Sequence, residues 1–305
     1  MRWIIRTSLV VSFSLWSGCG TLAAQDEPLS SSRTAAEKVT ARIRELGGKV
    51  ETYEVSGIGP LVGISLSQPR VTDEDLADLN VFPNLAMLVL ASTSVTDVGL
   101  DGLKRFPLLG YLNVANTKIT DAGLKHLADL KSLGILNLAE TPITNDGLKH
   151  LRKHNLSHLV LTRTRITGEG LIHIKDMTDL KILWMNNVKL TDEGVMHLKS
   201  LRNLEDLRVG NTWITDRGLK QLSGLTKLRI LDVDQNPIGD NGLAHLQVLD
   251  KLQELDLRFT AVSDDGLKHL KGLKQLRRLD LSKTRVTGAG AAGLQDSLPK
   301  ATIAR

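Results

Sequence analysis

Residues 109–132 read LGYLNVANTKITDAGLKHLADLKS, and residues 133–155 read LGILNLAETPITNDGLKHLRKHN. The second stretch repeats the first with substitutions and one residue fewer. Ten such units follow one another, and the intervals between their first leucines are 24 residues except for one of 23. These leucines are Leu61, Leu85, Leu109, Leu133, Leu156, Leu180, Leu204, Leu228, Leu252 and Leu276. A constant period of this length is the signature of an architecture of stacked repeats.

Each unit, counted from its first leucine as position 1, contains two kinds of apolar spacing. Positions 4 and 6 are apolar while positions 3 and 5 vary, which predicts a short strand with one buried face. The pair at positions 12 and 13, such as Thr120 and Asp121, predicts the start of a short helix, because threonine caps free amides and aspartate suits the positive helix end. Glycine at position 15 is costly in an ordinary helix, so its recurrence indicates tight packing against the neighbouring unit.

One unit cannot bury its own apolar face, so the units are predicted to stack. We therefore expect residues 61–297 to form an α/β solenoid of ten repeats. Its strands would align into a parallel sheet on the concave side, and its short helices would line the convex side. A strand spacing of about 4.8 Å makes the inner surface roughly 45 Å long.

The two ends of a solenoid need covers. Residues 34–37 (TAAE) resemble a capping box that opens a helix, Gly47 and Gly48 would end this helix, and residues 49–55 alternate like a strand. We predict an N-terminal cap of helix plus strand over residues 33–60. Residues 298–305 are predicted to be a C-terminal cap strand.

The first 24 residues have the features of an export signal. Arg2 and Arg6 precede a mostly apolar run, residues 7–18, which is too short to span a bilayer. Small residues up to Ala24 offer a cleavage site. We therefore predict a signal peptide over residues 1–24 and a secreted or periplasmic, cell-envelope location.

A polar leader, residues 25–32, is predicted to follow the signal peptide. The alternative is a lipoprotein anchored at Cys19, the single cysteine of the chain. Residues 15–19 (LWSGC) approximate a lipobox, although the leucine is one position too far from the cysteine. No later stretch of sequence is long and apolar enough for a membrane-spanning helix.

The core of the repeat, T-x-[IV]-T-D-x-G-L, resembles the cysteine-containing subclass of leucine-rich repeats. Threonine at position 9 stands where that subclass has cysteine or asparagine, at Thr93, Thr117, Thr141, Thr164, Thr212, Thr260 and Thr284. Over about residues 34–305 the chain also resembles secreted bacterial leucine-rich-repeat proteins. The resemblance implies a leucine-rich-repeat horseshoe and a scaffold for protein interactions. It carries over no catalytic residue and no named partner.

Composition and motifs argue against several classes of function. The chain is 24% charged with a net charge of +5, and its basic residues are interspersed with acidic ones, so we expect no nucleic-acid partner. The motifs G-x-x-x-x-G-K, H-E-x-x-H, G-x-S-x-G and C-x-x-C are all missing from the sequence. We expect no enzymatic activity and no cofactor.

Two ladders of titratable residues raise the question of metal binding. Histidine recurs at position 18, at His126, His150, His173, His197, His245 and His269. Duplication of a solvent-facing segment produces such a ladder without any metal, and no carboxylate recurs beside it. Aspartate recurs at position 5, at Asp232, Asp256 and Asp280. This spacing suits calcium, but arginines on the same surface can neutralise it: Arg208, Arg258 and Arg278. We predict no metal site.

Aromatic residues make up only 3% of the chain, so each is informative. Phe82 and Phe106 take the core position 22. Four others take variable positions whose side chains should reach solvent on or beside the concave face: Tyr111, Trp184, Trp213 and Phe259. An exposed tryptophan on a scaffold is a frequent anchor of an interface.

Positions 3 and 5 of units three to six carry apolar residues that should lie side by side on the concave face. We predict that they form one contiguous patch that binds a partner, with an arginine at its rim and a second tryptophan nearby. The predicted site consists of Tyr111, Ile135, His158, Val160, Ile182, Trp184, Arg208 and Trp213. The alternative is that these are isolated apolar residues of the kind found on any surface.

Two functions from different classes fit these features. The first is a non-enzymatic scaffold that binds a protein on its concave face outside the cytoplasm. The second is a structural or carbohydrate-binding component of the cell envelope, anchored through Cys19 if that residue is lipidated. Trp184 with Asn186, Asn187 and Arg208 also has the aromatic platform and polar groups typical of a sugar site. The resemblance favours the first function.

Overall fold

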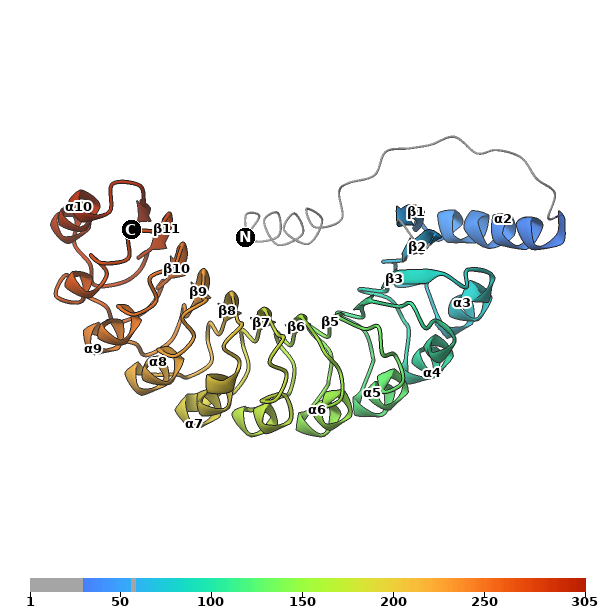
Figure 1. Ribbon diagram of the computed structural model, residues 1–305, viewed down its shortest axis with the longest axis horizontal. Helices are drawn as coiled ribbons and strands as arrows, with labels where there is room; N and C mark the ends of the chain where they lie inside the picture. The colour runs from blue at the N-terminus through green and yellow to red at the C-terminus, as the bar shows by residue number, and fades with distance from the viewer. Residues whose placement is uncertain (1–29, 56–58) are drawn as a thin grey trace.

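A computed structural model describes residues 30–55 and 59–305, which form one open, curved solenoid (Figure 1). The predicted signal peptide, Cys19 and residues 25–29 lie outside the described residues. In the described part of the chain, no helix has both the length and the apolar character needed to cross a bilayer.

The strands of the described residues form a single twelve-stranded sheet whose order follows the chain. They are β1 (Lys49–Val55), β2 (Gly59–Ser65), β3 (Leu85–Val89), β4 (Tyr111–Asn113), β5 (Ile135–Asn137), β6 (His158–Val160), β7 (Ile182–Trp184), β8 (Asp206–Arg208), β9 (Ile230–Asp232), β10 (Glu254–Asp256), β11 (Arg278–Asp280) and β12 (Thr302–Ala304). Strands β1 and β2 pair antiparallel, and the pairs from β2 to β12 are parallel. The sheet lines the concave side (Figure 1), so the predicted parallel concave sheet is confirmed.

The strands from β4 to β11 occupy positions 3–5 of their units, as the alternation predicts. Leu136 at position 4 pairs with Leu112 on one side and Leu159 on the other, and all three side chains are fully buried. Side chains at positions 3 and 5 point to the opposite face, because successive residues of a strand alternate. The repeat thus separates a constant core from a variable concave surface.

Short helical elements line the convex side (Figure 1). The α-helices are α3 (Asp73–Ala77), α4 (Asp97–Asp101), α5 (Asp121–Leu127), α6 (Asn145–Leu151), α7 (Thr191–Val195), α8 (Asp216–Leu222), α9 (Asp240–Leu243) and α10 (Gly288–Ser297). The 3-10 helices are η1 (Asp78–Val81), η2 (Gly102–Arg105), η3 (Gly168–His173), η4 (Met196–Ser200), η5 (Ala244–Leu246) and η6 (Gly266–His269). The predicted threonine cap is confirmed at α5, where the Thr120 hydroxyl accepts a hydrogen bond from the Ala122 amide.

The N-terminal helix differs from the prediction at its start. Helix α2 (Ser30–Glu45) begins before Thr34, so the predicted capping box at residues 34–37 is wrong and the polar leader overlaps the helix. Residues 30–33 contain neither proline nor glycine, and nothing in them stops the helix from extending. The helix ends as expected, because Gly47 has a left-handed φ of 78°. Ile43 on α2 is buried against the first repeat.

At the other end, β12 is shorter than the strand predicted over residues 298–305. It covers Thr302–Ala304 and pairs in parallel with β11. Leu298 and Ala301, just before it, are buried in the core. Helix α10 and this short strand therefore complete the last unit of the solenoid.

Neighbouring units are tied together by the aspartate at position 13, a role that its place at a helix start did not reveal. The Asp97 carboxylate accepts hydrogen bonds from the amide and the hydroxyl of Thr120 in the next unit, at 2.8 and 2.6 Å. A side chain on Gly123 would place its Cβ 2.4 Å from the same carboxylate. The recurring glycine is therefore required by the aspartate of the preceding unit, which confirms the prediction of tight packing.

The junction between β6 and β7 lacks this link because position 13 is Gly168. Its amide donates to the Lys189 carbonyl at 2.9 Å, and a Cβ there would lie 2.1 Å from the Leu190 carbonyl oxygen. The preceding short unit fills its core differently as well. His154 takes the place of a leucine, is buried, and contacts the Leu127 carbonyl through Nε2 at 3.0 Å.

Candidate binding surface on the concave face

The predicted strand residues lie together on the concave face. The pairing register places position 3 residues side by side in the order Tyr111, Ile135, His158 and Ile182. It places position 5 residues side by side in the order Val160, Trp184 and Arg208. The six residues other than Arg208 are called the apolar patch: Tyr111, Ile135, His158, Val160, Ile182 and Trp184. Each is partly buried, so the patch is a continuous surface with one side open to solvent.

The two titratable members of the apolar patch are uncharged at neutral pH. Burial lowers the pKa of His158, and the nearby Lys181 lowers it further. Burial also raises the pKa of Tyr111. Because both shifts favour the neutral forms, the patch presents no charge between β4 and β7.

Trp184 is less exposed than predicted. The Arg208 guanidinium lies over its ring, 4.3 Å from the ring centre, and the indole Nε1 is buried without a hydrogen-bond partner among the described residues. Arg208 is itself held by Asp206, with two hydrogen bonds of 3.0 Å to the carboxylate. Neighbouring strands lie close enough for long side chains at position 5 to stack, which explains the partial burial. The result is a fixed Trp–Arg–Asp arrangement at the rim of the patch.

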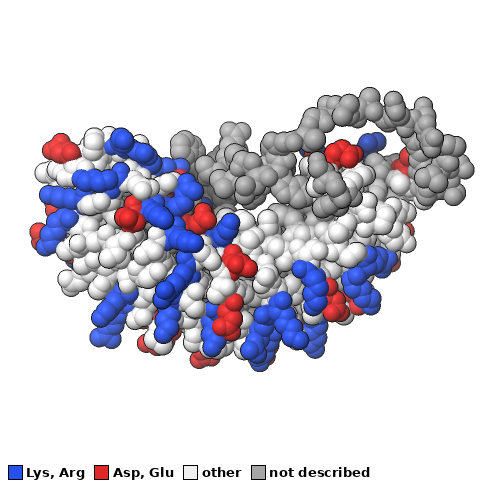
Figure 2. All heavy atoms as spheres, viewed as in Figure 1, with Lys and Arg blue, Asp and Glu red and all other residues white. Residues whose placement is uncertain are grey.

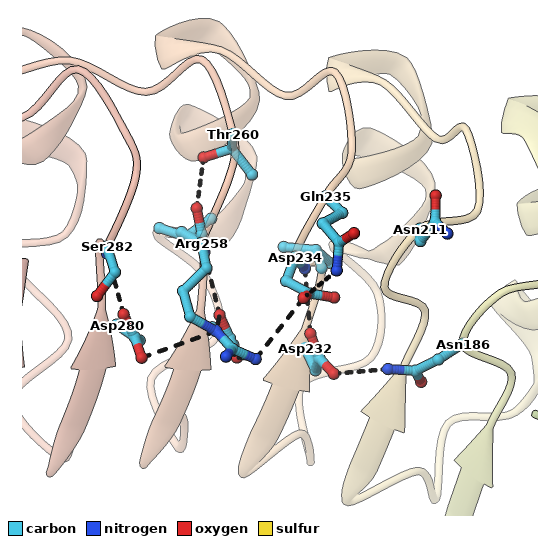
Figure 3. A network of polar contacts seen from close by, with 12 residues as sticks. Asn186, Asn211, Asp232, Asp234, Gln235, Arg258, Thr260, Asp280 and Ser282 are labelled. Carbon is cyan, nitrogen blue, oxygen red and sulfur yellow. Dashed lines mark hydrogen bonds and ion pairs between the residues drawn. The ribbon is translucent and has the colours of Figure 1, made fainter. Parts of the chain in front are cut away.

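From β8 onward the concave face is charged. Figure 3 shows Arg258 between three carboxylates, at 2.6 Å from Asp256, 3.6 Å from Asp234 and 3.7 Å from Asp280. Asp232 extends the group by accepting a hydrogen bond from the Asn186 amide at 2.8 Å. We call Asp232, Asp234, Asp256, Asp280 and Arg258 the carboxylate network.

Two aspartates of the carboxylate network, Asp232 and Asp256, hold their protons more tightly than isolated aspartates do. Burial, reinforced by the charges of Asp234 and Asp256, raises the pKa of Asp232 to about 7. Burial also raises the pKa of Asp256, although Arg258 opposes this shift. Arg258 therefore neutralises only part of the negative charge that three neighbouring strands bring together.

The two ladders considered for metal binding differ in their surroundings. Arg258 occupies the centre of the aspartate ladder, which bears out the mixed charged face inferred from the sequence. In the histidine ladder on the convex side, His126 Nδ1 lies 3.0 Å from the Asp101 carboxylate of the preceding unit. Across residues 30–55 and 59–305, no three His, Cys, Asp or Glu side chains group closely enough to hold a metal ion.

Trp213 is the one predicted site residue that lies away from the sheet. It occupies position 10, in the loop beyond the C-terminal end of β8, and its side chain is 58% exposed. The Lys189 ammonium lies 5.4 Å from its ring centre. Phe259, at position 8 of a later unit, is 54% exposed. The structure thus places Trp213 and Phe259 on a different surface from Tyr111 and Trp184, a division that the sequence prediction did not make.

The charge on the side of the solenoid is less evenly mixed than the sequence suggested. Figure 2 shows Lys and Arg side chains spread over the visible side face, with fewer Asp and Glu side chains between them. Other acidic side chains accept hydrogen bonds between neighbouring units, as those of Asp97 and Asp121 do from the amides of Thr120 and Thr144. The side face seen in Figure 2 therefore shows more basic than acidic side chains.

Comparison with known proteins agrees with this architecture. A model of the leucine-rich repeat matches residues 152–174, 200–223, 224–247 and 248–271. No curated protein gives a significant match to the sequence. The fold is similar to that of an internalin (inlF) from Listeria monocytogenes, at 20% identity and a TM-score of 0.54, covering 93% of this chain and 98% of the internalin.

A plant receptor has the same type of fold over a shorter part of its length. The leucine-rich-repeat ectodomain of the Arabidopsis receptor kinase HAESA, solved in complex with an extended IDA peptide hormone ligand, is 15% identical with a TM-score of 0.51. The match covers 73% of this chain and 37% of the ectodomain. The chain therefore has the leucine-rich-repeat fold, and the predicted leucine-rich-repeat horseshoe is confirmed.

Proposed function

We propose that this protein is a non-enzymatic scaffold that binds a partner protein outside the cytoplasm through the apolar patch of its concave face. The observation that carries the proposal is the register of β4 to β7. It brings Tyr111, Ile135 and Ile182 into one uncharged surface that remains open along one side. Continuous apolar surface rimmed by polar residues is typical of protein interaction sites.

The rim of the apolar patch is suited to anchoring a partner. Arginine and tryptophan, the types of Arg208 and Trp184, are among the residues that most often dominate the binding energy of an interface. Asp206 and the Trp184 ring already hold the Arg208 guanidinium in place, so little side-chain freedom remains to be lost on binding. A partner would meet a preorganised anchor next to an apolar surface.

The alternative use of Trp184 as a sugar platform is less well supported. One face of its ring is covered by Arg208, and the Asn186 amide is engaged by Asp232. A pyranose needs a free ring face and available polar groups beside it. These contacts favour a protein partner at this place. The peptide hormone bound to the HAESA ectodomain is a precedent for such a ligand on this fold.

The export signal read in residues 1–24 supports binding outside the cytoplasm. Mass spectrometry of the N-terminus of the protein made by its own host tests this part of the proposal. A chain that begins at Gln25 agrees with secretion, and a diacylated Cys19 indicates the anchored alternative. An intact Met1 would contradict export.

The two tryptophans of the repeats provide a matched test of the binding site. Wild-type protein, Trp184→Ala and Trp213→Ala are each used to capture partners from cell-envelope and extracellular extracts. We expect Trp184→Ala to lose the captured protein, with affinity reduced by about 2 kcal/mol or more, and Trp213→Ala to retain it. Equal capture by all three proteins, with circular dichroism showing intact folds, would contradict the assignment of the site.

A further inference from the structure

A second surface lies on the loops that follow the strands. We call it the loop edge; it consists of the residues at positions 8 and 10 of the repeats. In Figure 3, Asn211 and Gln235 lie in these loops, beyond the ends of the strands that carry the carboxylate network. The loop edge is therefore separate from the apolar patch, which lies on β4 to β7.

The loop edge carries the two aromatic side chains that are more than half exposed in the described residues, Trp213 and Phe259. Position 8 has a positive φ in nine units, mostly at small or polar residues, and Phe259 adopts this conformation with a φ of 56°. Trp213 has a φ of 68°, whereas other residues at position 10 have no positive φ. Both rings are thus held outward by backbone conformations that bulky residues rarely adopt.

The loop backbone is rebuilt around Trp213. In four other units the amide at position 10 donates to a carbonyl of the preceding unit, as Ala261 does to the Ile238 carbonyl at 2.8 Å. At this junction the direction is reversed, because Leu190 and Thr191 both donate to the Thr212 carbonyl at 3.2 Å. This local departure from the repeat turns the Trp213 ring toward solvent beside Lys189.

A groove of about 590 Å³ extends along the loop edge beside the Phe259 ring. Its lining includes Asn211, Gln235, Pro237, Phe259, Lys283 and Arg285. Amide side chains and an aromatic ring therefore share one shallow, open depression. The cationic side chains of Lys283 and Arg285 lie at one end of this groove.

Charge on the loop edge is strongly one-sided. Basic residues occupy positions 8 and 10 before and after the aromatic segment: Lys118, Arg163, Arg165, Lys189, Lys283 and Arg285. Within the described units the only acidic residue at these positions is Glu140, which pairs with Arg163 at 2.9 Å. The aromatic segment between Lys189 and Lys283 is uncharged. A ligand that covers it would meet cations at both ends.

Backbone groups of the loop edge are already used by the fold. The amides of Asn211, Gln235 and Phe259 donate to carbonyl groups of the following unit, at 2.8 to 3.1 Å. An acidic peptide would therefore gain few main-chain hydrogen bonds here. Recognition must come from side chains that repeat along the solenoid, which suits a polymer of repeating units with flat faces, hydroxyl groups and negative charges.

We propose that the loop edge binds an acidic polysaccharide. Sugar ring faces would pack on Trp213 and Phe259, which are both more than half exposed. Sugar hydroxyls would donate to the side-chain carbonyl oxygens of Asn211 and Gln235, because the amide nitrogens of these two residues already donate to Asn187 and Asp234. The carboxylates of the polymer would pair with the flanking cations Lys189, Lys283 and Arg285. This site does not depend on the proposed protein partner of the apolar patch.

Isothermal titration of the intact protein with hexameric oligogalacturonate tests the proposal. Neutral oligogalactan and poly-glutamate of similar length serve as comparison ligands. We expect oligogalacturonate to bind more tightly than either, with affinity that falls as salt is raised. Trp213→Ala combined with Phe259→Ala should weaken this binding about tenfold or more. Lys283→Gln combined with Arg285→Gln should also weaken it and should reduce its salt dependence.

Trp184→Ala is the matched control, because it removes a tryptophan from the apolar patch and should leave oligogalacturonate binding unchanged. Absence of oligogalacturonate binding would overturn the proposal. So would equal affinity for poly-glutamate, which would identify an acidic peptide as the occupant, or undiminished binding by the Trp213 and Phe259 double variant. Failure of the protein partner to depend on Trp184 would leave these results unaffected, so the two proposals fail separately.

Discussion

The concave face has two halves built on the same framework. In β4 to β7 residues at positions 3 and 5 form the apolar patch, with Asn113 and Asn137 beside it. In β9 to β11 the aspartates at position 5 belong to the carboxylate network, and Asp234 and Arg258 lie just beyond the strands. Beneath both halves the position 4 leucines are almost completely buried, as Leu183 and Leu231 show. The repeat therefore fixes the shape of the surface while leaving its chemistry free to change from one strand to the next.

The two halves also differ in how their side chains are held. Those of the apolar patch lie side by side across the paired strands, and at its rim Arg208 forms a charge pair with Asp206. Those of the carboxylate network are held by hydrogen bonds and ion pairs that centre on Arg258. Substitutions should consequently affect binding in the first half, and stability and its pH dependence in the second.

The largest effect is expected from the shared core. Leu183→Ala beneath the apolar patch and Leu231→Ala beneath the carboxylate network should each lower the free energy of unfolding by about 2–5 kcal/mol, because each leaves a cavity. Urea unfolding followed by circular dichroism measures both. A large loss in one half and almost none in the other would show that the two halves do not share one framework.

A smaller effect is expected at the centre of the carboxylate network. Arg258→Ala should lower stability at pH 8 by about 1–3 kcal/mol, because Asp234, Asp256 and Asp280 lose their common cation. The loss should shrink as the pH is lowered, because the raised pKa of Asp256 lets this carboxylate take up a proton more readily than an isolated aspartate. Arg278→Ala is the control, since that side chain is half exposed and its nearest carboxylate, Glu254, is 3.8 Å away. Equal losses in the two variants would mean that Arg258 has no special role.

The smallest effect is expected at Asp232, whose pKa is about 7 in the folded chain and near 3.9 when unfolded. Between these values the folded state holds a proton that the unfolded state lacks, so the stability from this group falls as the pH rises from 4 to 7. Asp232→Asn should remove this dependence and stabilise the protein by about 1 kcal/mol at pH 8. Thermal melts at pH 5 and pH 8 measure it, and a variant with the wild-type pH dependence would contradict the assignment.

Most of the fold could be predicted from the sequence because every unit repeats the same pattern of residues. The strand at positions 3–5, the buried leucines and the packed glycine follow from spacing alone, and each is confirmed at units such as 109–132. The start of α2 was not readable, because residues 30–33 neither favour nor prevent a helix and no repeat supports them.

The sequence also located the candidate surface better than it described it. Register made the apolar patch contiguous, since residues 24 positions apart become neighbours in a solenoid. It did not reveal that Arg208 covers Trp184, because that contact depends on side-chain conformation across two strands. Nor did it reveal that Asp97 bonds the next unit, because an aspartate at a helix start has a sufficient local explanation.

The central claim is that the partner protein binds the apolar half of the concave face. Isothermal titration with the purified partner tests it by comparing Ile135→Asp and Glu254→Arg, two charge-altering changes at the same repeat position in the two halves. The account predicts that Ile135→Asp weakens binding about 30-fold or more and that Glu254→Arg leaves it within about threefold. Strong weakening by Glu254→Arg with an unchanged affinity for Ile135→Asp would contradict the claim.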